Sequence, residues 1–204
     1  MVRLLCVRHG ETVWNAAGRF QGHTDIPLSP RGQQQAAALA RVLARETVRA
    51  VYASDLLRTR ETAQVLAASL GIPVQHSADW REIAFGAWEG LTEGEIQQRD
   101  AQAFMAWRAD PMHLAPPGGE TLQQVSDRLS AALTSLISAG QGHTAVLVAH
   151  GGTLRVLFCL VLGFPPQAYR RFMLAPGSLS ELYVDAQHAV LARLNDTHHF
   201  GETV

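Results

Sequence analysis

The stretch Val2-Arg-Leu-Leu-Cys-Val-Arg-His-Gly10 joins a short apolar run to an arginine, a histidine and a glycine. Short apolar runs bounded by turn-forming residues are typical of buried strands. The same form recurs at Val48–Ala53, which precedes Ser54-Asp55, and at Thr144–Ala149, which precedes His150-Gly151-Gly152. We therefore expect three buried strands whose carboxyl ends carry polar or turn-forming residues.

Helical patterns separate these strands along the chain. Ser29-Pro30 is typical of a helix start, Gly71 of a left-handed helix stop, and Thr92-x-x-Glu95 of a capping box. Strands that alternate with helices predict an α/β fold, a three-layer sandwich with a mainly parallel central sheet flanked by helices. The expected helices are 30–44, 54–70, 92–107, 122–136 and 153–162, and a hairpin is expected over 179–184 and 190–194.

Three basic side chains follow the predicted strands. In open α/β sheets, ligands bind beyond the carboxyl ends of the strands, so we expect His9, Arg58 and His150 in one site. Arg8 and Gly10 support this interpretation, because arginine offers a planar fork of donors and glycine allows close approach of the backbone. The helix expected after His150 can direct its first amides at the same anion. The pattern predicts an oxyanion cradle around an imidazole.

Arg58 has two interpretations. If Ser54 caps the helix, Arg58 lies close to the helix start, where a cation opposes the helix dipole. An ion pair with Glu61 would explain that position, but an exposed pair of this kind contributes only about 0.3 kcal/mol. We favour an anion held between Arg58 and the end of the helix.

Glu82 is the main candidate for a general acid. It lies among Trp80, Ile83, Phe85 and Trp88, and an apolar setting keeps a carboxyl group protonated near neutral pH. A protonated carboxyl is what general acid catalysis requires. Glu89 in the same segment is the second candidate.

Composition excludes several function classes. The 204 residues carry 17 basic and 18 acidic side chains, a net charge of −1, which argues against a nucleic-acid or anionic membrane surface. All the basic residues are arginine. Without lysine, phosphate-loop nucleotide sites, Schiff-base enzymes and protein kinases are excluded.

The cysteines and the apolar runs indicate a soluble protein. Cys6 and Cys159 lie within apolar runs, so we expect buried free thiols and no disulfide. The longest nearly continuous apolar stretch, Val156–Phe164, is far shorter than the roughly 18–20 residues of a spanning helix. The beginning of the chain lacks a signal-peptide pattern. We expect a cytoplasmic protein.

A series of short motifs extends over most of the chain. They are Arg8-His9-Gly10-Glu11-Thr12, Asn15, Gln21-Gly22, Asp25-Ile26-Pro27-Leu28-Ser29-Pro30-Arg31-Gly32, Ser54-Asp55-Leu56-Leu57-Arg58, Pro117-Gly118-Gly119-Glu120-Thr121 and His150-Gly151-Gly152. In this order they resemble the histidine phosphatase superfamily, which includes phosphoglycerate mutases and relatives of acid phosphatases. The resemblance implies a phosphoglycerate mutase-like fold, with residues 1–204 in one domain and a small helical cap over about 85–120.

The resemblance also implies roles for the site residues. His9 would become transiently phosphorylated, and Glu82 would donate a proton to the leaving oxygen and later accept one from water. Arg8, Arg58 and His150 would supply cations to the phosphoryl group without a metal or cofactor. His9 must be neutral to attack, so we expect a backbone carbonyl to hold the proton of its other nitrogen. The implied phosphate- or substrate-binding residues are Asn15, Gln21, Gly22 and Gly151.

The segment after Glu82 bears on the choice between phosphatase and mutase. Mutases of this family resemble one another there, with His-Tyr-Gly and a downstream Asn-Lys that binds the substrate carboxylate. Phe85–Thr92 lacks that lysine and resembles α-ribazole phosphatases and broad-specificity phosphomonoesterases. The chain is also shorter than a typical mutase. We expect a phosphomonoester hydrolase acting on a small phosphorylated metabolite, with a cofactor-dependent phosphoglycerate mutase as the alternative.

Two other function classes have weaker support. A metal-dependent hydrolase could use His9, His150 and His198-His199, but adjacent histidines are a weak ligand pattern. A non-catalytic phospho-ligand binder would be expected to lack the nucleophile or the acid, and both are present. We expect no nucleic-acid or membrane partner and allow for a homodimer. The pocket rim is expected from Arg19–Asp25, Thr92–Leu114 and Pro116-Pro117.

Overall fold

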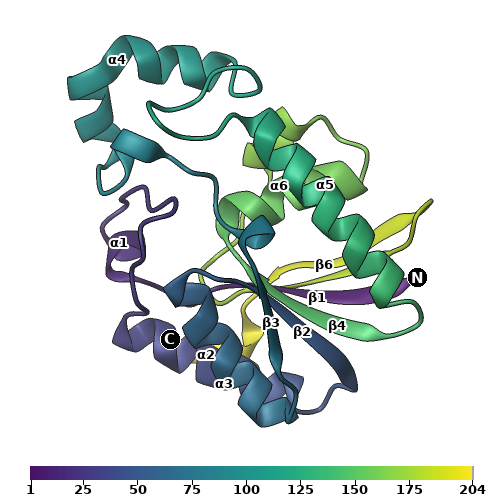
Figure 1. Cartoon of the computed structure of the whole chain (residues 1–204). Coiled ribbons are helices and arrows are strands. Elements are labelled where there is room, and N and C mark those ends of the chain that lie inside the picture. Colours follow the sequence, from purple (N-terminus) through teal and green to yellow (C-terminus); the bar gives the residue numbers. More distant parts are fainter. Residues whose placement is uncertain (204) are drawn as a thin grey trace.

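A six-stranded sheet in the order β3-β2-β4-β1-β5-β6 forms the centre of the computed structural model, which describes residues 1–203 (Figure 1). The four strands β3, β2, β4 and β1 are parallel, and β5 and β6 are antiparallel to their neighbours. The predicted mainly parallel sheet is confirmed. The strands are β1 (Val2–Arg8), β2 (Val48–Ser54), β3 (Val74–Ser77), β4 (Thr144–Ala149), β5 (Leu179–Val184) and β6 (Ala189–Asp196).

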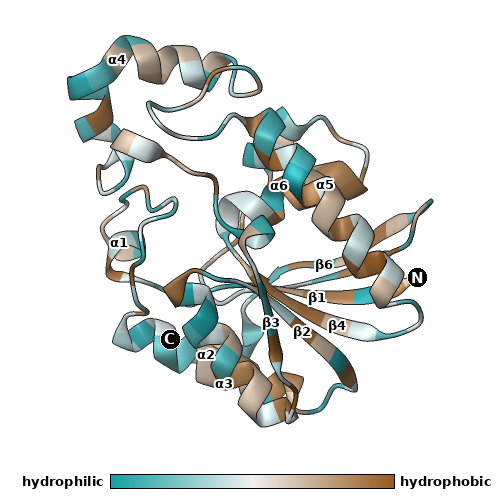
Figure 2. Ribbon diagram, in the orientation of Figure 1, coloured by the Kyte–Doolittle hydropathy of each residue, from teal (hydrophilic) through white to brown (hydrophobic). Residues whose placement is uncertain are grey.

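Helices cover both faces of the sheet and complete the predicted three layers (Figure 1). Leu5 and Val7 of β1 pack with α2 and α3, whereas Leu4 and Cys6 pack with α5 and α6, because successive side chains of a strand point to opposite faces. Figure 2 shows mostly apolar central strands, as expected for strands buried on both faces. The α-helices are α1 (Val13–Ala16), α2 (Pro30–Leu43), α3 (Leu57–Leu70), α4 (Glu93–Ala109), α5 (Leu122–Ala139) and α6 (Gly151–Val161).

Local signals placed several helix ends correctly. Ser29 caps α2 by accepting a hydrogen bond from the Gly32 amide, and Gly71 ends α3 in the left-handed conformation. Thr92 and Glu95 form the predicted capping box at the start of α4. Both cysteines are buried and free, as expected.

Two predicted helix starts were wrong. α3 begins at Leu57 rather than at Ser54, which is the last residue of β2. Its first amide, that of Leu57, donates to Asp25 Oδ1 at 2.6 Å, so a distant side chain supplies the cap that the local sequence lacks. α6 begins at Gly151, two residues earlier than expected, and β3 and α1 were not predicted.

The chain leaves the sheet between β3 and α5. Trp88, Ile96, Phe104 and Trp107 form a separate buried cluster under α4, which stands away from the sheet in Figure 1.

Among the residues described, no helix is both long enough and apolar enough to cross a bilayer. Within residues 1–203, four short 3-10 helices complete the fold: η1 (Ala78–Trp80), η2 (Gly86–Trp88), η3 (Pro166–Arg171) and η4 (His198–Thr203).

Candidate active site

The three basic residues expected at the strand ends do meet. The rings of His9 and His150 have centroids 5.2 Å apart, and Arg58 Nε lies 3.2 Å from His150 Nδ1. Strand order explains this, because β4 lies between β1 and β2 and all three end at the same edge of the sheet. His9, Arg58, Arg8 and Glu82 line one cavity of about 370 Å³ at this edge.

His9 is held as a neutral imidazole with one free nitrogen. Its side chain is 2% exposed, and its Nδ1 lies 2.7 Å from the carbonyl oxygen of Gly10. A carbonyl can only accept, so Nδ1 carries the proton and Nε2 keeps its lone pair. Burial, and then the charges of Arg58 and Arg8, hold the pKa of His9 well below its ordinary value. The expected backbone carbonyl partner is confirmed.

His150 offers a hydrogen-bond donor rather than a charge. The guanidinium of Arg58 can only donate, so His150 Nδ1 accepts and Nε2 carries the hydrogen. That Nε2 is buried and has no hydrogen-bond partner among residues 1–203. Burial, and then the charge of Arg58, lowers the pKa of His150 well below its ordinary value. Beside the buried Arg58 guanidinium, His150 presents a neutral N–H donor, and that it supplies a cation to a bound phosphoryl group stays a prediction.

Two buried guanidinium groups supply the positive charge of the site. Burial lowers the pKa of Arg8 and of Arg58 to about 10, which still leaves both charged at neutral pH. Arg58 Nη1 and Nη2 donate to the carbonyl oxygens of Thr24 and Gly22 at 3.0 and 2.8 Å, which fixes its orientation. Arg8 Nε is a second buried donor without a partner among the described residues. Buried hydrogen-bond donors are rarely left unpaired. The unpaired donors His150 Nε2 and Arg8 Nε therefore indicate a site for an anion.

The structural explanation for Arg58 does not hold. The carboxylate of Glu61 accepts a hydrogen bond from the Leu28 amide at 2.7 Å, and its partner is not Arg58. Arg58 is instead 1% exposed and turned toward His150. Its position agrees with the interpretation as an anion ligand.

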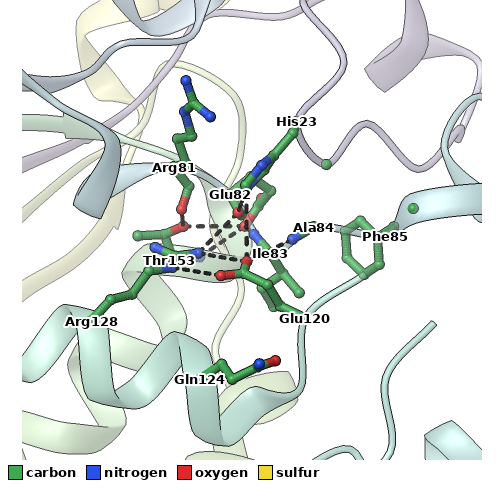
Figure 3. Close-up of polar contacts among 12 residues, drawn as sticks. His23, Arg81, Glu82, Ile83, Ala84, Phe85, Glu120, Gln124, Arg128 and Thr153 are labelled. Atoms are coloured by element: carbon green, nitrogen blue, oxygen red, sulfur yellow. Dashed lines mark hydrogen bonds and ion pairs between the residues drawn. The ribbon is translucent and has the colours of Figure 1, made fainter. Parts of the chain in front are cut away.

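Glu82 lies at the amino end of α6, and its neighbours differ from those expected. Its carboxylate accepts hydrogen bonds from the amides of Gly152 and Thr153 at 2.9 and 3.0 Å and from its own neighbour Ile83 at 3.0 Å (Figure 3). The predicted apolar setting is correct only in part. Ile83 and Phe85 line the same cavity as Glu82, and Trp80 is buried in the core, but the carboxylate itself contacts backbone amides. The Glu82 carboxyl group therefore occupies the amino end of α6, where backbone amides point outward.

Glycine at position 152 is required by this contact. A Cβ added there would collide with the Glu82 carboxylate, and a Cβ at Gly151 would lie 3.2 Å from Arg8 Nε. The two glycines after His150 therefore let both Glu82 and Arg8 approach the backbone of α6 closely.

The Glu89 side chain binds backbone amides of two segments and does not line the cavity. Its carboxylate accepts hydrogen bonds from the amides of His23, Thr24, Phe85 and Gly86. It thereby joins the loop before α2 to the segment that follows Glu82. Of the two candidate acids, Glu82 is the one that lines the same cavity as His9.

The remaining predicted residues divide into lining and supporting positions. Asn15 and Gln21 line the cavity. The carbonyl of Gly22 orients Arg58, and Gly151 packs against Arg8, so these glycines support the two arginines of the cavity.

The predicted rim was partly correct. Arg19, Phe20, Phe104, Trp107 and Arg108 line the cavity, whereas the Pro116-Pro117 loop does not. Sequence reasoning missed Arg155, Tyr169 and Arg170, which also line it. Arg155 could have been found, because it follows Gly151 by four positions on α6, about one helical turn. No local signal marks the other two.

The histidines of the metal-hydrolase alternative have other partners. His198 Nδ1 lies 2.9 Å from Asp196, and His199 donates toward the carbonyl of Gly177 at 3.0 Å. In the part of the chain that is described, no three His, Cys, Asp or Glu side chains are grouped to hold a metal ion.

Comparison with known proteins identifies the family. The model of the histidine phosphatase superfamily (branch 1) matches residues 4–197. Phosphoserine phosphatase 1 of Hydrogenobacter thermophilus is 34% identical over 202 residues, covering 99% of this chain and 96% of its own. The protein named "Probable phosphoglycerate mutase GpmB" of Salmonella choleraesuis is 34% identical over 192 residues, covering 92% and 87%.

A solved structure is also similar to this chain over nearly its whole length. The α-ribazole phosphatase of Shigella flexneri superposes with a TM-score of 0.87 at 31% identity, covering 95% of this chain and 96% of that one. The family match and the strand-end site point to the same conclusion. The chain belongs to branch 1 of the histidine phosphatase superfamily.

Proposed function

We propose that the protein hydrolyses phosphate monoesters of small metabolites through a phosphohistidine formed on His9. The observation that carries the proposal is the free Nε2 of a buried, neutral His9 beside two fixed guanidinium groups and the unpaired N–H of His150. A phosphoryl group requires positioning and charge stabilisation more than covalent assistance, and this arrangement supplies both.

In the first step, His9 Nε2 attacks phosphorus and the bond to the ester oxygen breaks. Arg8, Arg58 and His150 Nε2–H bind the phosphoryl oxygens. Glu82 enters this step with a proton on its carboxyl group, as the role of general acid requires. Glu82 then gives that proton to the departing oxygen, and the alcohol leaves.

In the second step, water attacks the phosphohistidine. Glu82, now a carboxylate, accepts a proton from the water while the phosphorus–nitrogen bond breaks. Inorganic phosphate leaves and the His9 lone pair is restored. Because Arg8 and Arg58 supply the cationic charge, the proposed reaction is independent of metal ions, and hydrolysis should survive excess chelator.

Residues 85–120 are proposed to act as a cap over the cavity. Phe104 and Trp107 of α4 reach the cavity wall, while α4 itself stands away from the sheet (Figure 1).

Two of the relatives above are named as phosphatases and one as a mutase, so a phosphoglycerate mutase is the second candidate function.

A single set of assays tests the proposal. We expect inorganic phosphate to be released from 3-phosphoglycerate or other phosphomonoesters, and no 2-phosphoglycerate to accumulate when 2,3-bisphosphoglycerate is present. Quenched reactions should contain acid-labile, base-stable phosphate on the protein, and His9→Ala should lack both the label and turnover. Full activity of folded His9→Ala would overturn the mechanism, and loss of activity in chelator with recovery on adding a divalent ion would favour a metal hydrolase.

A further inference from the structure

Two arginines of the cavity wall have no part in the proposed reaction. Arg155 of α6 and Arg170 of η3 both line the cavity that contains His9. The guanidinium of Arg155 lies over the ring of Tyr169, 5.3 Å from its centroid. That of Arg170 lies 5.5 Å from the same centroid and 4.7 Å from the centroid of Trp107. The buried ring of Tyr169 therefore contacts both guanidinium groups.

These two guanidiniums lack acidic partners. Within residues 1–203, neither Arg155 nor Arg170 forms an ion pair, whereas Arg19 and Arg108 on the same cavity are paired with Glu95 and Glu93. Hydrogen bonds hold only their Nε atoms, from Arg155 to the Gly151 carbonyl at 2.8 Å and from Arg170 to the Tyr169 hydroxyl at 3.1 Å. No hydrogen bond to the other described residues uses their terminal nitrogens.

We propose that Arg155 and Arg170 form a subsite for a second anionic group, a carboxylate or a second phosphate, on the leaving group of the substrate. The inference rests on the proposed function and adds a substrate class to it. A planar guanidinium matches both anions through paired hydrogen bonds. Stacking on Tyr169 restricts both side chains before the ligand arrives, which lowers the entropic cost of binding.

The subsite lies within reach of the phosphate site. The charge of Arg155 is close enough to Arg8 to contribute to lowering the Arg8 pKa, after burial, which is the larger cause. Arg155 is half-buried and Arg170 is exposed. Arg155 is therefore the inner contact, and Arg170 lies nearer the cavity mouth, where its effect should weaken with added salt.

Binding to the His9→Ala protein tests the subsite without turnover. 3-Phosphoglycerate and glycerol 1-phosphate differ only in a carboxylate against a neutral hydroxymethyl group. By calorimetry we expect 3-phosphoglycerate to bind at least about tenfold more tightly, the range for hydrogen bonds to charged groups. A parallel pair, 1,3-propanediol bisphosphate and propyl phosphate, shows whether a second phosphate is preferred instead.

The variants assign any preference to these residues. In the His9→Ala background, Arg155→Gln with Arg170→Gln should bring the affinity ratio of each pair close to one, and Arg170→Glu should lower it. Arg171→Gln is the matched control, because Arg171 is an exposed neighbour that does not line the cavity, and it should keep the ratio. Equal affinities within both pairs, or a preference that survives the double change in folded protein, would overturn the subsite.

Turnover separates this inference from the proposed function. The protein with His9 intact should hydrolyse the preferred anionic member of each pair with the higher kcat/KM. Binding preference without hydrolysis of any substrate would overturn the proposed function and leave the subsite standing. Hydrolysis with equal kcat/KM within both pairs would overturn the subsite and leave the proposed function standing.

Discussion

Arg128 Nη2 donates a hydrogen bond to the main-chain carbonyl of Glu82 at 3.0 Å, although the two residues are 46 positions apart. His23 Nε2 lies 2.9 Å from the same oxygen (Figure 3). Glu120 accepts from Arg128 Nε at 3.0 Å and from the Ala84 amide at 2.9 Å. Burial alone would raise the pKa of Glu120, but Arg128 holds it below its ordinary value. Arg128 Nη1 also donates to the carbonyl of Asp79 at 2.8 Å, so this ion pair secures the backbone on both sides of Glu82.

Arg128→Gln should therefore misplace the acid without touching the substrate. We expect kcat for alkyl phosphates to fall by about 10–100-fold with a smaller change in KM, because a displacement of about 1 Å can cost 10²-fold. Arg128→Lys should recover part of the loss. Activated aryl phosphates should be affected less, which separates positioning from general destabilisation. Equal losses for both leaving groups would contradict this role. Arg193→Gln is the control, because it removes ion pairs with Asp196 and Glu181 and Arg193 does not line the cavity.

Glu82→Gln should reveal the two uses of the carboxyl group. The first step with alkyl phosphates should slow by about 10²–10⁴, the usual range for lost acid–base catalysis. An activated aryl phosphate needs little protonation, so its first step should suffer less while hydrolysis of phospho-His9 still slows. Rapid-quench measurement should find the phosphoenzyme accumulating with the aryl substrate. If it does not accumulate and both substrates lose equally, another acid has this role.

Gly152→Ala should reduce activity more than stability. The added Cβ would collide with the Glu82 carboxylate, so the acid must shift from the amino end of α6. We expect kcat to fall at least tenfold, since the misplaced group takes part in both steps. Gly94→Ala in α4 is the matched control, because a Cβ there meets nothing within 4 Å and alanine favours a helix. Similar kinetics for the two variants would contradict the contact.

Acid should destabilise the fold through the buried histidines. Burial lowers the pKa of His150 well below its ordinary value, as it does for His9. Below about pH 6.5 the unfolded chain gains protons that the folded chain does not, so stability falls as pH falls. Each such group contributes at most about 1.4 kcal/mol per pH unit. The free energy of unfolding, measured with urea between pH 7 and 5, should change less steeply with pH in His150→Gln than in the unchanged protein. Identical slopes against pH would refute this account.

The sequence alone determined the α/β class and the convergence of His9, Arg58 and His150. Buried strands leave a local signal, because a strand covered on both faces is a continuous apolar run. Parallel strands then bring their carboxyl ends to one edge, so residues placed there meet whatever their separation. That general geometry was enough to predict that these three residues lie together at one edge of the sheet.

Only the tertiary structure decided what surrounds those residues. The amides of α6 that bind Glu82, the Asp25 cap on α3, the Arg128 contact to the Glu82 carbonyl and the support of Arg170 on Trp107 all join distant segments. Among the apolar neighbours of Glu82 in sequence, Trp80 is buried in the core, whereas the Glu82 carboxylate contacts the amino end of α6. Periodicity records which way a side chain faces, but packing decides which distant group it meets.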